Sequence, residues 1–169
     1  MRVYVASTLE ALKSLPGNGF AAPVAAHAVT PALREWYADG DAEELEYAAA
    51  DEAAESSLRL LAGEPGTARR RVVVAVDVPD AAVRPASSRS SEDATTRSAV
   101  TVDADVTMAE VASVHVDDTE AGPDVQRAVE ALAAADAGDE DARFDVDGAA
   151  GHELLWYDVS ELDDVLALG

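Results

Sequence analysis

The chain lacks cysteine, and among its 169 residues it has a single lysine, Lys13. The absence of cysteine excludes thiolate catalysis, cysteine-ligated zinc, iron–sulfur clusters and disulfide bonds. It also fits a reducing compartment, and the N-terminus has no apolar run long enough for a signal peptide, so we expect a cytoplasmic protein. Only 5% of the residues are aromatic, so the core must be built from valine and leucine rather than from large rings.

Basic side chains are scarce: 12 lysines and arginines stand against 34 aspartates and glutamates, which gives a net charge of −22. Such a surface repels phosphate groups, so we expect neither a nucleic acid nor a membrane as partner. A basic protein or peptide is the partner that this charge favours. Two other origins also account for the acidity, namely a GC-rich genome and adaptation to salt.

Several common motifs are also missing. The chain has no G-x-S-x-G, no G-x-x-x-x-G-K, no G-x-G-x-x-G and no H-E-x-x-H. These patterns carry the nucleophilic serine, the two main phosphate-binding loops and the zinc site of many enzymes. No stretch approaches the roughly 18 apolar residues that a transmembrane helix needs.

What the sequence does contain is an alternation of strand and helix signals. Strands are predicted over 2–6, 24–29, 71–78, 100–106, 112–116 and 152–159, and helices over 7–15, 31–38, 41–62, 123–138 and 160–166. Ser7, Thr30 and Asp41 are predicted as N-caps of the first three helices, and the turn at 16–19 is predicted to end the first. About six strands and five helices predict one layered α/β domain over residues 1–169, with a ferredoxin-like α+β sandwich as the alternative. The unbroken run VVVAV predicts a strand covered on both faces. Residues 84–98, rich in serine, threonine and arginine, predict an exposed, mobile loop.

Five stretches together resemble a known family. They are MRVYVAST, HAVTPALREWYADGDAEELEYAA, RRVVVAVDVPDAAV, VASVHVDD and GHELLWYDVSEL. In these the chain is similar to a family of short, acidic bacterial proteins classed as a domain of unknown function. The resemblance covers most of the chain outside 84–98, and it implies no activity and no site residues.

Acidic side chains at the ends of predicted strands suggest one function. Asp77 ends one strand, and Asp117 and Asp118 follow another. If the strands are parallel, these carboxylates meet at one edge of the sheet and offer the oxygen ligands that Mg²⁺ prefers. His115 shares a strand face with Asp117 and would act as a base or metal ligand. This interpretation is a metal-dependent hydrolase or phosphoryl-transfer enzyme; the alternative is that the same aspartates cap helices.

Aromatic side chains suggest a different function. Trp36, Tyr37 and Tyr47 lie in the acidic stretch REWYADGDAEELEY, and Trp156 lies in a second Trp–Tyr pair. Tryptophan and tyrosine are enriched at binding hot spots, and acidic surroundings suit a basic partner. The alternative is that Trp36 and Trp156 fill the core. We therefore favour a non-enzymatic cytoplasmic interaction or regulatory module without a cofactor, which predicts that Trp36 or Tyr37 is exposed.

Overall fold

A computed structural model describes residues 1–38, 40–86 and 97–169. In these residues seven strands form one antiparallel sheet, with the order β4-β5-β2-β1-β3-β6-β7. The strands are β1 (Arg2–Ser7), β2 (Val24–His27), β3 (Val72–Asp77), β4 (Val83–Pro85), β5 (Ala99–Val102), β6 (Val111–Asp117) and β7 (Leu154–Asp158). The α-helices are α1 (Leu9–Leu12), α2 (Leu15–Asn18), α3 (Pro31–Trp36), α4 (Ala42–Gly63), α5 (Gly122–Asp136), α6 (Glu140–Ala150) and α7 (Leu162–Leu166). The prediction of a layered α/β domain is confirmed.

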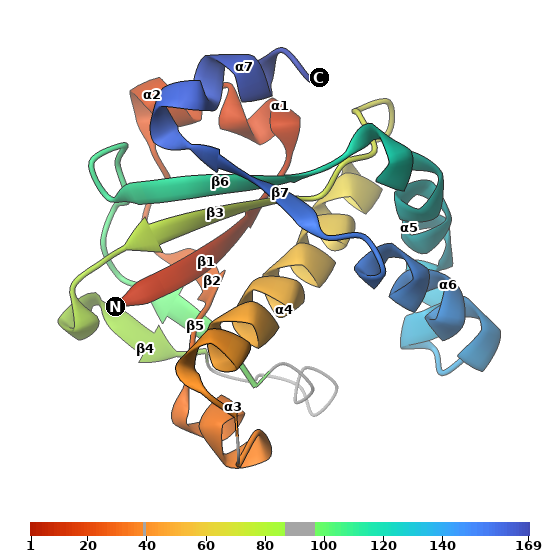
Figure 1. Ribbon diagram of the computed structural model, residues 1–169, viewed down its shortest axis with the longest axis horizontal. Helices are drawn as coiled ribbons and strands as arrows, with labels where there is room; N and C mark the ends of the chain where they lie inside the picture. Colours follow the sequence, from red (N-terminus) through yellow and green to blue (C-terminus); the bar gives the residue numbers. More distant parts are fainter. Residues whose placement is uncertain (39, 87–96) are drawn as a thin grey trace.

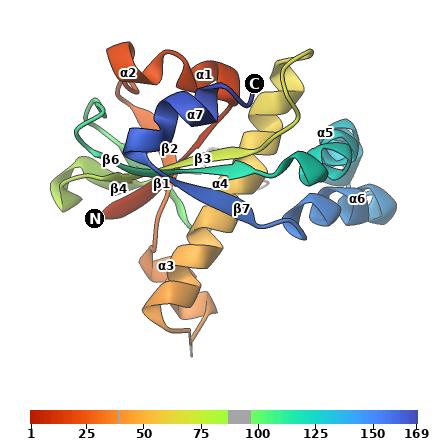
Figure 2. The same cartoon turned by 45° about the horizontal axis from the view of Figure 1, so that its top comes forward.

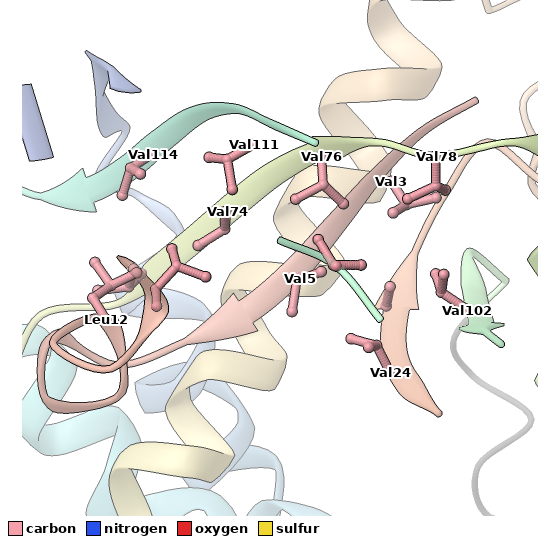
Figure 3. Close-up of a cluster of buried hydrophobic side chains, with 14 of the residues drawn as sticks. Val3, Val5, Leu12, Val24, Val74, Val76, Val78, Val102, Val111 and Val114 are labelled. Atoms are coloured by element: carbon pink, nitrogen blue, oxygen red, sulfur yellow. The ribbon is translucent and has the colours of Figure 1, made fainter. Parts of the chain in front are cut away.

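Helices cover both faces of this sheet (Figures 1 and 2). The short helices α1, α2 and α7 lie on one face, and the long helix α4 crosses the other, with α3 leading into it. Valines of the central strands pack against Leu12, Leu15 and Val165 on the first face, and Figure 3 shows this cluster. On the second face Tyr4 and Val73 pack against α3 and α4.

Strand β3 shows why the sequence gives two cores rather than one. All five residues from Val72 to Val76 are buried, because successive side chains point to opposite faces and both faces are covered by helices. Val72, Val74 and Val76 face α1, α2 and α7, whereas Val73 and Ala75 face α4. The prediction from VVVAV is therefore confirmed.

The helices α5 and α6 form a third packed unit with the C-terminal half of α4. Leu58 and Leu61 of α4 pack against Val125 and Leu132 of α5 and Val146 of α6. The sequence did not predict α6, because its only large apolar side chains are Phe144 and Val146, and Phe144 is exposed. Its helical form depends on packing against α5 rather than on a strong amphipathic pattern.

The N-terminal helix differs from the prediction. Thr8 rather than Ser7 is the N-cap of α1, and its hydroxyl accepts from the Ala11 N–H at 3.1 Å, while Ser7 ends β1. The predicted stop at 16–19 is a second short helix, α2, because proline is tolerated in a first helical turn. Gly19 ends α2 at φ +63°, where a Cβ would lie 2.2 Å from the Val106 carbonyl oxygen.

Two further predictions concern the loop over 84–98 and the lack of a transmembrane helix. Of the loop predicted over 84–98, residues 87–96 lie outside the described residues, and part of the rest is strand β4, which the sequence did not predict. Of the helices in the described part of the chain, none combines the length and apolar character needed to cross a membrane.

Candidate functional site

The junction of α3 and α4 is built by two strong helix starts. Thr30 caps α3 by accepting from the Leu33 N–H at 3.1 Å, and Pro31 opens its first turn. Asp41 caps α4 in a reciprocal capping box, in which Asp41 accepts from the Glu44 N–H at 2.9 Å and Glu44 accepts from the Asp41 N–H at 3.1 Å. Because α3 buries Leu33 against the sheet, the remaining residues of its last turn face outward.

The three aromatic residues predicted for binding are exposed at this junction. The exposed fractions are 63% for Trp36, 44% for Tyr37 and 56% for Tyr47, so the alternative that Trp36 fills the core is wrong. Tyr37 and Tyr47 line an open hollow of about 820 Å³ between the end of α3 and the first turns of α4. Its acidic lining residues are Glu43, Glu44 and Asp51. We call this surface, with Trp36 beside it, the aromatic–acidic face.

Trp36 lies outside the hollow and has a different partner. The guanidinium carbon of Arg97 lies 3.6 Å from the centroid of the Trp36 ring, which is a cation–π contact. Such contacts contribute about 0.5–1 kcal/mol at exposed sites. This face therefore already binds one guanidinium group of its own chain, on the aromatic ring of Trp36. Tyr37 and Tyr47 offer aromatic rings as well.

The electrostatics of the hollow favour a cation. Burial raises the pKa of Asp51; nearby Arg71 partly offsets this effect, and the charge of Glu153 raises the pKa further. The charge of Asp51, followed by burial, raises the pKa of Tyr47. Asp51 and Glu153 thus add negative charge beside Tyr47, and a cation placed there would lower both pKa values.

The aspartates predicted to hold Mg²⁺ do not converge. Strands β3 and β6 are antiparallel, with Val72 opposite Val116 and Val76 opposite Val111, so Asp77 and Asp117 end up at opposite ends of the sheet. Asp118 is exposed and accepts from the Glu120 N–H at 3.1 Å as the cap of a short 3-10 helix. In the described ranges no group of three or more His, Asp or Glu side chains is arranged to hold a metal ion.

Both Asp77 and Asp117 instead pair with arginine. Asp77 is exposed and receives two hydrogen bonds of 2.8 Å from Arg2. Asp117 is buried: its Oδ2 accepts from the Arg71 N–H at 2.7 Å and from Arg71 Nε at 2.9 Å, and its Oδ1 accepts from Arg71 Nη2 at 2.7 Å. With both oxygens occupied, the Asp117 carboxylate joins the start of β3 to the end of β6.

His115 does share a strand face with Asp117, as predicted, but its contact is with another residue. Its Nε2 lies 3.0 Å from the Ser113 hydroxyl, and both residues face the α4 side of the sheet. Burial lowers the pKa of His115, and the positive charge of Arg2 lowers it further. The Ser113 hydroxyl contacts Nε2 of His115, and Arg71 occupies the Asp117 carboxylate, so His115 and Asp117 do not form the pair that the predicted metal site requires.

Strand β7 exposes Trp156, which was considered among the candidate aromatic residues, and Leu155, which was not predicted as part of a site. Trp156 is 59% exposed and Leu155 is 42% exposed, so the alternative that Trp156 fills the core is also wrong. Leu154 packs against the α4-side core, and Trp156 two residues later lies on the same side of the strand. The sequence carried a weak signal: in LLWYD both the odd and even positions are apolar, which does not specify an inward face.

A buried polar network at His27 was also not predicted. His27 Nδ1 lies 2.8 Å from the Ser98 hydroxyl, and His27 Nε2 lies 2.8 Å from the Ser56 hydroxyl of α4. Ser98 in turn donates to Glu52, also on α4. Because Glu52 only accepts, the Ser98 hydroxyl accepts from Nδ1–H of His27. This network fixes α4 against β2. A histidine that points inward among apolar residues indicates that a hydrogen-bond partner is present, but the sequence does not show which residue it is.

The fold and this site define a layered α/β domain with an exposed aromatic–acidic face on α3 and α4. The chain belongs to a family of unknown function, DUF6912, whose family model matches residues 1–166. No curated protein and no solved structure matches the chain.

Proposed function

We propose that this chain is a cytoplasmic interaction module that binds a basic segment of another protein through the aromatic–acidic face. The observation that carries the proposal is the hollow at the α3–α4 junction, where Tyr37 and Tyr47 are exposed beside Glu43, Glu44 and Asp51. Tyrosine rings attract cations through their faces, and carboxylates supply charge-assisted hydrogen bonds. Lysine and arginine side chains are the protein groups that can both contact an aromatic face as a cation and donate hydrogen bonds to carboxylates.

The charge of the whole chain supports the same kind of partner. A net charge of −22 speeds the approach of a basic segment and repels acidic proteins. The Arg97 contact on Trp36 supports arginine in particular, since it shows a guanidinium group seated on this surface. The net negative charge of the chain repels a phosphate-rich partner.

The test is a binding titration with a defined peptide. We expect a fluorescent peptide of alternating arginine and valine to bind, and the same peptide with glutamine in place of arginine not to bind. Tyr47→Ala weakens binding by about 1 kcal/mol, or roughly fivefold, since it removes an exposed cation–π partner. Raising the salt from about 0.05 M to about 0.5 M weakens binding further, because exposed charges are screened.

The chain offers a matched control for each variant. Phe144→Ala removes an exposed ring from α6, away from the hollow, and Glu140→Gln removes an acid from the same helix. These variants should leave the affinity unchanged, whereas Tyr47→Ala and Glu43→Gln reduce it. Equal binding of the arginine and glutamine peptides, or equal loss in the Phe144→Ala and Tyr47→Ala variants, refutes the proposal.

A further inference from the structure

Strand β7 is an open edge of the sheet. It pairs with β6 on one side and is the last strand in the order, and within the described residues no further backbone hydrogen bond joins it to another element. The free side of an edge strand presents backbone N–H and C=O groups to which another strand can pair. Exposed Leu155 and Trp156 flank this edge on the two faces of the sheet.

The strand at the opposite edge of the sheet, β4, is less suited than β7 to pairing with another strand. Strand β4 has three residues, one of which is Pro85, which lacks an N–H, and another is Arg84, whose charge discourages pairing. Strand β7 has five residues and contains neither proline nor a basic residue. Among the described residues, β7 is therefore the longer of the two edge strands and has an N–H group at every position.

We propose that the basic partner binds as an extended strand that pairs with β7 and enlarges the sheet. This inference rests on the proposed function and adds how the partner binds. Every second side chain of the added strand lies on the α4 side of the sheet, over Trp156 and towards Tyr47. Main-chain hydrogen bonds give affinity in this mode, and the alternating side chains give specificity. Valine or isoleucine at the intervening positions packs on Leu155.

The charge around β7 selects the partner. Glu153 precedes the strand, Asp158 ends it, and Asp163 and Asp164 follow on α7. Leu154 of β7 packs on the same apolar cluster as Ala48 of α4, and Ala48 also lines the hollow, so β7 and the aromatic–acidic face border one cluster on the α4 side of the sheet. A second copy of this chain would bring the same acids together and is repelled, whereas a basic strand neutralises them.

The experiment compares two peptides that differ only in their backbone. The alternating arginine–valine peptide is tested beside a version with alternate backbone nitrogens methylated, which keeps every charge but cannot pair along one side. We expect the methylated peptide to bind at least about tenfold more weakly, since it cannot form the main-chain hydrogen bonds along its methylated side. In hydrogen exchange the unmodified peptide slows amides of Leu154–Asp158 and leaves those of Val83 and Arg84 unchanged.

The outcomes separate this inference from the function on which it rests. If both peptides bind equally and exchange at β7 does not change, the added strand is refuted and the basic-segment function stands. If neither peptide binds, the proposed function itself fails. If the chain sediments as a dimer and the peptide does not dissociate it, the occupant of the edge is a second copy, and the inference is wrong.

Discussion

Replacing Asp117 with asparagine tests whether the buried pair with Arg71 holds β3 and β6 together. In the native chain the Arg71 side chain is 4% exposed and that of Asp117 is 0% exposed. The change leaves the guanidinium charge of Arg71 buried. The donors of Arg71 then face a neutral amide, whose NH₂ group cannot accept their hydrogen bonds. Breaking a buried pair by removing one partner costs about 3–5 kcal/mol.

The chain supplies a matched control at the other end of the same sheet. Asp77 makes an equivalent two-point pair with Arg2, but both side chains are exposed to water. Exposed pairs contribute about 0–1 kcal/mol, so Asp77→Asn should lower the free energy of unfolding by no more than this. The two variants differ in burial rather than in chemistry.

Urea unfolding followed by circular dichroism measures both changes. With a slope of about 2 kcal/mol per molar urea, the midpoint falls by about 1.5–2.5 M in Asp117→Asn and by less than about 0.5 M in Asp77→Asn. Combining Asp117→Leu with Arg71→Met recovers only part of the loss, because the Arg71 backbone N–H loses its 2.7 Å acceptor. Equal midpoints for the two asparagine variants would show that the Arg71 pair is not structural.

Two further predictions concern the capping box and His115. Asp41→Ala removes the N-cap of α4 and should lower the free energy of unfolding by about 1 kcal/mol in the same assay, whereas an unchanged midpoint would contradict the cap. His115 should titrate by NMR below its ordinary pKa of 6.5, and Arg2→Gln should raise that value. The unfolded chain binds this proton at a higher pH than the folded chain does, so the free energy of unfolding decreases as the pH falls below about 6.5. His115→Gln should reduce this decrease.

The sequence was a good guide where a local pattern has one physical solution. The capping signals at Thr30 and Asp41 fixed the starts of α3 and α4, because a side-chain oxygen placed there satisfies an otherwise free N–H. The exposure of Tyr37 also followed from an acidic, aromatic stretch at a helix junction. The aromatic half of the candidate site was therefore predictable.

The sequence was a poor guide where strand direction decides the outcome. Asp77 and Asp117 both follow strands, and only the antiparallel pairing of β3 with β6 places them at opposite ends of the sheet. Strand direction depends on how the helices pack on the sheet, which periodicity does not encode. The same holds for Arg71, whose partner is 46 residues away in the chain.

The sequence by itself determined the composition of this protein's surface and core: many acids, one lysine, no cysteine, and a core of valine and leucine. It also determined where helices α3 and α4 begin, since capping is local. The tertiary structure alone decided that β7 is an open edge, that Trp156 is exposed on it, and that Leu154 packs on the same cluster as Ala48. These features depend on contacts between residues far apart in the chain, and such contacts are set by packing rather than by local pattern.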